Sequence, residues 1–164
     1  MLIPTHNRTR LLVRLIESLR MADEDAQHID YWLLENGSSV ALPILQATGE
    51  WENLHYRHYE KGNKSEALNQ VMKEISPTGL LVFLDDDVTI HPDFFQTYRK
   101  AAAAYGSGHY FGGPVNPDYV VAPSVEIRPY LPPSCRKFDL SAGQQVREFS
   151  EYRLFLGANW ACFA

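Results

Sequence analysis

The sequence lacks the features that mark membrane-spanning, secreted or nucleic-acid-binding proteins. Its 164 residues contain no apolar run of about 18 residues, so we expect no transmembrane segment. The two cysteines, Cys135 and Cys162, are too few for a disulfide framework and lack metal-ligand spacing. The formal net charge of -5 argues against nucleic acid as a partner. Because the N-terminus has no signal-peptide pattern, we expect a cytoplasmic protein.

The most apolar stretch of the chain ends in three consecutive acidic residues. Hydrophobic residues make up 45% of the sequence, which is enough for one domain with a core. The apolar run 80–84 follows Gly79, as is typical of a strand that is buried on both faces. Asp85, Asp86 and Asp87 come next, and carboxylates so close together repel one another. A hard divalent cation would relieve this repulsion, so the tract predicts a metal-dependent site.

Apolar periodicity predicts alternating strands and helices. The expected strands cover residues 2–4, 31–34, 54–59 and 80–84, and the expected helices cover 11–19, 63–75 and 92–102. Asn63 and Glu66 have the spacing of a helix capping box. Prolines recur between residues 114 and 135, which predicts a long irregular loop. This order predicts a three-layer α/β/α sandwich with a mostly parallel sheet.

Polar residues follow three of the four expected strands. Thr5 to Arg8, Glu35 to Ser38 and Asp85 to Asp87 each begin where a strand ends. The carboxyl ends of parallel strands lie along one edge of a sheet, and ligands bind there in open α/β folds. The three segments are therefore expected to form one site.

These segments resemble the motifs of family 2 glycosyltransferases, which have the GT-A fold. The resemblance rests on Ile3-Pro4-Thr5-His6-Asn7-Arg8, Glu35-Asn36-Gly37-Ser38, Gly62 to Asn69 and Phe83-Leu84-Asp85-Asp86-Asp87. Three further segments follow in the family's order: His91 to Phe95, Gly112-Gly113-Pro114 and Gly157-Ala158-Asn159-Trp160. Each motif alone is weak, but seven in the right order are a specific signal.

The resemblance implies a site for a nucleoside diphosphate sugar. The positions that correspond to the nucleotide site are Pro4, Thr5, Asn7, Arg8, Glu35, Asn36, Ser38, Lys64, Asp85 and Asp86. Asp87, together with Asp85, would ligate Mn²⁺ or Mg²⁺ between the protein and the diphosphate. The positions that correspond to the donor sugar and the acceptor are Gly112, Gly113, Asn159 and Trp160.

The implied reaction moves a sugar, with inversion, from a nucleoside diphosphate donor to an acceptor hydroxyl. A UDP-sugar is the expected donor, and a saccharide or lipid-linked acceptor would place the protein in polysaccharide biosynthesis. Residues 1–90 would form the nucleotide-binding half of a single GT-A domain, and residues 91–164 would begin the acceptor-binding half. Four arginines between residues 8 and 20 leave open a peripheral position at the inner membrane face, although a solvated helix face is the more common role.

The chain departs from the family pattern in three places. Glu35 replaces the usual Asp, few residues precede the first motif, and the family's catalytic base lies beyond the segment that ends here at Ala164. We therefore name no catalytic base and expect a domain that is truncated at both ends, with little or no transfer activity of its own.

Two alternatives stay open. The chain could bind a nucleotide sugar without transferring it. It could also be a haloacid-dehalogenase-type phosphatase with Asp85 as nucleophile and Asp87 as acid/base, although that family carries this motif on its first strand.

Overall fold

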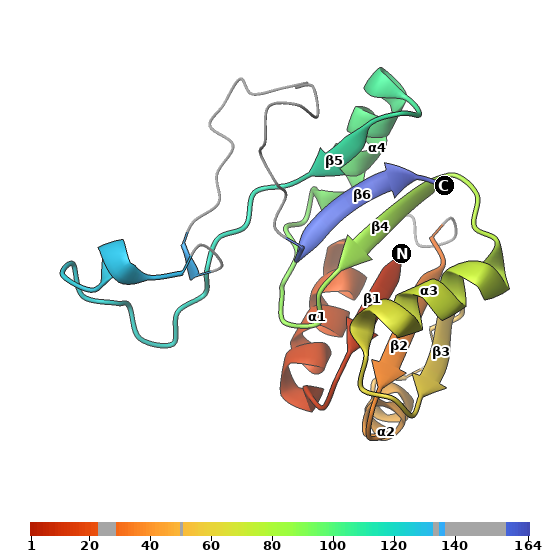
Figure 1. Cartoon of the computed structure of the whole chain (residues 1–164), viewed down its shortest axis with the longest axis horizontal. Coiled ribbons are helices and arrows are strands. Elements are labelled where there is room, and N and C mark those ends of the chain that lie inside the picture. The colour runs from red at the N-terminus through yellow and green to blue at the C-terminus, as the bar shows by residue number, and fades with distance from the viewer. Residues whose placement is uncertain (23–28, 50, 133–134, 137–156) are drawn as a thin grey trace.

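A six-stranded sheet runs through the centre of the molecule. The computed structural model describes residues 1–22, 29–49, 51–132, 135–136 and 157–164. Within these residues the strand order is β3-β2-β1-β4-β6-β5 (Figure 1). The strands are β1 (Leu2–Thr5), β2 (Tyr31–Asn36), β3 (Leu54–Tyr59), β4 (Leu80–Leu84), β5 (Tyr110–Gly112) and β6 (Asn159–Phe163).

Most of the sheet is parallel. Strands β3, β2, β1 and β4 pair in parallel, whereas β6 lies antiparallel between β4 and β5. The helices that connect the strands are α1 (Thr9–Ala22), α2 (Ala41–Ala47), α3 (Lys64–Ile75) and α4 (Phe94–Tyr105). The expected strands and helices are therefore present, although α4 begins at Phe94, so Pro92 precedes the helix instead of lying in its first turn. The capping bond from Glu66 N to Asn63 Oδ1 is 3.1 Å long.

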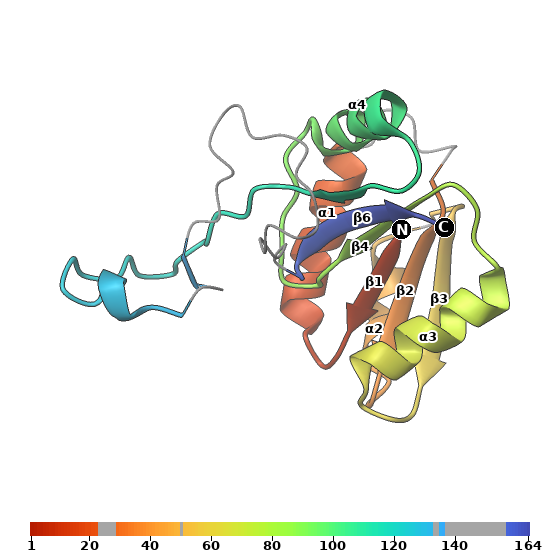
Figure 2. The same cartoon turned by 45° about the horizontal axis from the view of Figure 1, so that its top comes forward.

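Helices cover both faces of the sheet (Figures 1 and 2). Ile3 and Leu33 point to one face and pack in a core with α1, α2 and α4. Leu2 and Leu34 point to the other face and pack under α3. Successive residues of a strand point to opposite faces, so β1 and β2 are buried on both sides. This arrangement confirms the three-layer α/β/α sandwich.

The structure also contains elements that the sequence pattern does not predict. Helix α2 is only seven residues long and follows the turn after β2. Strand β6 inserts beside β4 in the antiparallel direction. The proline-rich segment extends away from the sheet, and its described part includes the short 3-10 turn η2 (Arg128–Tyr130) (Figure 1).

Among the described residues, none of the helices is both long enough and apolar enough to cross a lipid bilayer.

Candidate functional site

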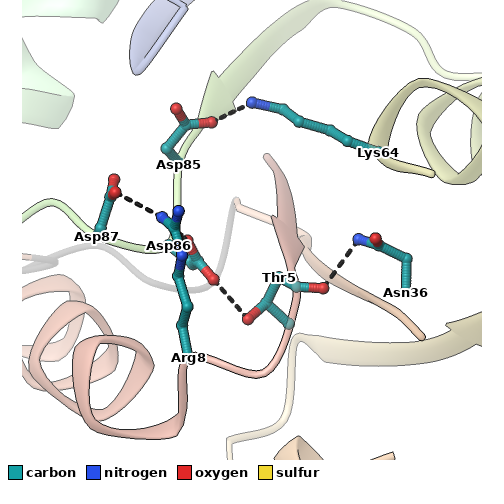
Figure 3. Close-up of polar contacts among 7 residues, drawn as sticks. All are labelled: Thr5, Arg8, Asn36, Lys64, Asp85, Asp86 and Asp87. Atoms are coloured by element: carbon teal, nitrogen blue, oxygen red, sulfur yellow. Dashed lines mark hydrogen bonds and ion pairs between the residues drawn. The ribbon is translucent and has the colours of Figure 1, made fainter. Parts of the chain in front are cut away.

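The polar tips of β1, β2 and β4 lie side by side at one rim of the sheet (Figure 3). The Thr5 hydroxyl donates a hydrogen bond of 2.7 Å to Asp86 Oδ2. The Asn36 side-chain amide donates one of 2.8 Å to the Thr5 carbonyl oxygen. These contacts join residues that are far apart in the sequence. The predicted convergence of the three tips is therefore confirmed.

The expected site residues divide into a buried set and an accessible set. Pro4, Thr5, Glu35, Asn36 and Asp86 are buried. The accessible set comprises Asn7, Arg8, Ser38, Lys64 and Asp87, which are exposed, and Asp85, which is partly exposed. The buried residues form a frame, and the accessible ones carry the groups that a ligand could reach.

Asp86 belongs to the buried frame. Its side chain is only 6% exposed, and its two carboxylate oxygens accept from the Thr5 hydroxyl and from the Arg8 guanidinium. A buried carboxylate is tolerated when it is paired and hydrogen-bonded. Asp86 therefore holds the tip of β4 against β1.

Glu35 is also part of the frame, and its partners are all internal. The residue is completely buried. Oε1 accepts hydrogen bonds from the backbone amides of Val40 (2.7 Å) and Ala41 (2.8 Å), and Oε2 accepts from the Tyr56 hydroxyl (2.5 Å). Burial and, after it, the Glu35 contact raise the pKa of Tyr56. The carboxylate thus caps the first turn of α2 and fixes the turn after β2.

His6 fills the space between the turns after β2 and β3, a role that the sequence does not indicate. Its Nδ1 contacts the Asn36 carbonyl oxygen. Gly37 has φ +98°, and a Cβ on this residue would lie 2.5 Å from His6 Cε1. A Cβ on Gly62 would lie 3.3 Å from the same atom. The imidazole is therefore packed against backbone at both turns, which fixes the shape of the rim.

Two basic side chains meet the acidic tract. Arg8 Nη1 lies 2.5 Å from Asp87 Oδ2 and 3.3 Å from Asp86 Oδ1. Lys64, from the first turn of α3, forms an ion pair with Asp85 on the other side (Figure 3). The charge of Asp86, followed by that of Asp87, raises the pKa of Arg8. Two cations face three carboxylates, so the cluster keeps a negative charge and still attracts a cation.

The accessible carboxylates fit a metal ion that shares its ligands with a substrate. In the described part of the chain, no three His, Cys, Asp or Glu side chains are grouped so that they could hold a metal. Asp87 and Asp85 have side-chain exposures of 41% and 28%. Mg²⁺ is commonly bound by one or two carboxylates, with substrate phosphates and water as the other ligands. The two carboxylates of Asp85 and Asp87 therefore suit a cation that binds together with a diphosphate.

The segment around Asn159 lies beside the acidic tract. The Asp85 amide donates to the Ala158 carbonyl oxygen (3.1 Å), and Tyr98 of α4 donates to Asn159 Oδ1 (2.6 Å). A Cβ on Gly113 would lie 2.5 Å from Asn159 Nδ2, so the close approach at this glycine is to the chain's own side chain. Gly112 pairs with Trp160 across β5 and β6. These four expected sugar-site residues are thus brought together.

The Trp160 ring stacks on Phe83 at a centroid distance of 4.0 Å. This contact holds the start of β6 against β4, next to the acidic tract.

A cavity of about 350 Å³ opens next to the rim, between the end of β3 and the first turns of α3. Its lining residues are His58, Tyr59, Glu60, Lys61, Glu66, Ala67 and Gln70. None of these belongs to the acidic tract or to its basic partners.

Comparison with known proteins identifies a related family. The model of the family described as "Glycosyl transferase family 2" matches residues 1–154. A mannosyltransferase from Pyrobaculum calidifontis, solved in complex with GDP-Man and Mn2+, has a similar structure, with a TM-score of 0.58 and 18% sequence identity. The match covers 68% of this chain and 34% of that protein, so this chain spans about a third of its length. No curated protein matches the sequence.

Proposed function

We propose that this chain, which belongs to glycosyl transferase family 2, binds a nucleoside diphosphate sugar at the carboxyl-end rim of its sheet and serves in sugar transfer. The observation that carries the proposal is the meeting of Arg8 and Lys64 with the acidic tract Asp85 to Asp87 at that rim. Basic side chains can bind phosphate groups, and carboxylates can bind a metal ion, so this combination suits a diphosphate that binds together with a divalent cation.

Arg8 and Lys64 are the proposed partners of the diphosphate. Both side chains are half exposed and lie on opposite sides of the acidic tract. Guanidinium and ammonium groups bind phosphate oxygens through charge-assisted hydrogen bonds. Asn7 and Ser38 are exposed at the tips of β1 and β2, and we assign them to the nucleoside. The exposed groups that would contact the ligand lie on a buried frame, which includes Pro4, Thr5, Asn36 and Asp86. Glu35 stabilises the turn and has no direct role in this proposal.

Asp87, with Asp85, is the proposed metal-binding pair. When bound there, Mn²⁺ or Mg²⁺ would offset the charge that develops on the leaving nucleoside diphosphate. The Mn2+ in the structurally similar mannosyltransferase is consistent with this choice. That protein binds GDP-Man, so the donor to be tested is a GDP-sugar as well as the expected UDP-sugar.

The acceptor side of the site involves the segment after β5 and the start of β6. Asn159 and Trp160 lie on β6 beside the end of β4, and Gly112 and Gly113 adjoin them from the side of β5. This arrangement supports a role beside the donor sugar. Inversion at the anomeric carbon, a saccharide or lipid-linked acceptor, and the division into halves at residues 90 and 91 stay predictions. So do a cytoplasmic location and a role in polysaccharide biosynthesis.

The test is calorimetry with UDP and GDP in the presence and absence of Mn²⁺. We expect the metal to raise the affinity for one of the nucleotides by about tenfold or more, because Asp87 would hold the cation and its charge would offset that of the diphosphate. Asp87→Ala should bind that nucleotide equally with and without Mn²⁺. Asp118→Ala is the matched control, since Asp118 is an exposed carboxylate that pairs with Arg14.

Failure to bind either nucleotide would overturn the proposed site. Equal affinity of the unaltered chain with and without Mn²⁺ would contradict the metal-binding role alone.

The family match bears on one of the two alternatives. The phosphatase alternative is wrong, because residues 1–154 match a glycosyltransferase family and the Asp motif follows β4, not the first strand. Nucleotide-sugar binding without transfer stays open. Donor consumption with a panel of saccharide acceptors distinguishes it from catalysis.

A further inference from the structure

Arg8 has two carboxylate partners that differ in exposure. Asp86 is buried and also accepts a hydrogen bond from the Thr5 hydroxyl, so the buried frame fixes its position. Asp87 has a side chain that is 41% exposed, and the Arg8 side chain is 50% exposed. The Arg8–Asp87 contact is therefore on the solvent side. It can open without uncovering the core, whereas the Asp86 contact keeps Arg8 near the rim.

The carboxylate of Asp87 that binds Arg8 is also the proposed metal ligand. Arg8 Nη1 lies 2.5 Å from Asp87 Oδ2. Deprotonation cannot remove the charge of Arg8, because Asp86 raises a pKa that is already very high. Two cations at adjoining positions on one carboxylate repel each other. A movement that separates the two side chains, and not a loss of the Arg8 charge, is therefore what frees Asp87.

We propose that Arg8 competes with the divalent cation for Asp87, and that its release from Asp87 couples metal binding to diphosphate binding. The inference rests on the proposed function, which supplies the metal and the diphosphate. Without a nucleotide, Arg8 covers Asp87 and weakens cation binding. A diphosphate offers the guanidinium an alternative anionic partner, and Asp87 becomes available. The coupling is reciprocal, so the cation raises nucleotide affinity by the same factor.

The first experiment measures Mn²⁺ binding in the absence of any nucleotide, by the electron paramagnetic resonance signal of free Mn²⁺. We expect Arg8→Gln to bind Mn²⁺ about two- to fivefold more tightly than the unaltered chain, in keeping with a half-exposed ion pair. Arg14→Gln is the matched control. It removes the same charge from an arginine of α1 that pairs with Asp118 instead. Equal Mn²⁺ affinity of Arg8→Gln and Arg14→Gln would overturn the inference.

A second measurement uses the unaltered chain and does not depend on how well a variant folds. In a chain labelled with ¹⁵N-arginine, the side-chain Nε–H signal of Arg8 should shift as Mg²⁺ is added, whereas the signal of Arg14 should not. Saturation with Mg²⁺ while the Arg8 signal stays in place would overturn the competition.

These outcomes are separable from a failure of the proposed function. Both measurements are free of nucleotide, so nucleotide binding can fail while Arg8→Gln still gains Mn²⁺ affinity. Conversely, metal-assisted UDP or GDP binding with no change of Mn²⁺ affinity in Arg8→Gln would leave the proposed function intact and reject only the competition.

Discussion

A single buried hydrogen bond connects the tips of β1 and β4. Thr5 Oγ1 donates to Asp86 Oδ2 at 2.7 Å, and both residues are less than 5% exposed. Removal of one partner leaves the other buried and unsatisfied, which costs more than the bond itself contributes.

Thr5→Val keeps the shape of the side chain and removes this donor. We expect the variant to lose about 1–3 kcal/mol of unfolding free energy, because the buried carboxylate of Asp86 then lacks one of its two hydrogen-bond partners. Urea unfolding followed by circular dichroism measures the loss. Ser38→Ala is the control, since Ser38 is exposed at the tip of β2. Equal stability of the two variants would show that the Thr5 bond contributes little.

The acidic tract shows what a sequence does and does not reveal at the residue scale. Three consecutive aspartates after an apolar run indicate a charged strand tip. The sequence pattern cannot assign a role to each aspartate, because the roles depend on contacts with distant residues. Two of the aspartates contact residues about 80 positions earlier in the sequence, and the third contacts a residue of α3. Asp86 is buried against Thr5, Asp87 meets Arg8, and Asp85 meets Lys64. A cation was expected at this tract, and the structure supplies two from its own side chains.

At the scale of elements, Glu35 determines where α2 begins. Its carboxylate accepts from the amides of Val40 and Ala41, and it meets the Tyr56 hydroxyl of β3. Aspartate is the usual residue of the resembled motif here, and its shorter side chain reaches less far. The longer side chain of glutamate therefore connects three elements: β2, α2 and β3.

Glu35→Gln tests this connection without a change of size. The amide nitrogen cannot accept a hydrogen bond, and the negative charge at the start of α2 is lost. We expect about 1–3 kcal/mol less unfolding free energy. Glu52→Gln changes an exposed glutamate in the same way and serves as control in urea unfolding. A loss for Glu35→Gln no larger than the loss for Glu52→Gln would contradict the capping role.

Long periodic elements are predictable here, and short or antiparallel ones are not. The strands and helices expected from apolar spacing are all found. Burial leaves a continuous apolar run in 80–84, and one-sided burial leaves an apolar stripe at helical spacing in 63–75. Helix α2 has seven residues and depends on Glu35 for its first turn, although Pro43 near its start was an available signal. The position of β6 between β4 and β5 depends on pairing between segments about 80 and 50 residues apart, which no local pattern reveals.

At the scale of the whole molecule, the buried frame should determine the stability of the fold, whereas the accessible groups should determine ligand binding. Changes at Thr5, Glu35 or Asp86 should act through folding, because these side chains are hydrogen-bonded inside the protein. Changes at Arg8, Lys64 or Asp87 should act on ligands, because exposed ion pairs contribute little to stability.

Buried tyrosines give the whole molecule a pH dependence above neutrality. Burial raises the pKa of Tyr98, whose hydroxyl donates to Asn159 Oδ1 at 2.6 Å and connects α4 to β6. Burial also raises the pKa values of Tyr56 and Tyr59. In the unfolded chain a tyrosine titrates near pH 10. The unfolded state therefore loses its protons first. The stability that Tyr98 contributes is fully present below about pH 10 and decreases as the pH rises from there toward the folded-state pKa.

Tyr98→Phe should make the unfolding free energy fall less steeply as the pH rises above 10. For each tyrosine that stays protonated only in the folded state, the unfolding free energy falls by about 1.4 kcal/mol per pH unit above pH 10. Urea unfolding between pH 8 and 11.5 measures the slope in the unaltered chain and in the variant. The variant should be less stable at pH 8, because Asn159 loses a hydrogen bond, but its stability should depend less on pH. Tyr130→Phe is the control, since Tyr130 is 85% exposed and its hydroxyl is solvated in both states. If Tyr98→Phe and Tyr130→Phe show the same slope, another group governs the alkaline unfolding, and the contact between α4 and β6 does not depend on the proton of Tyr98.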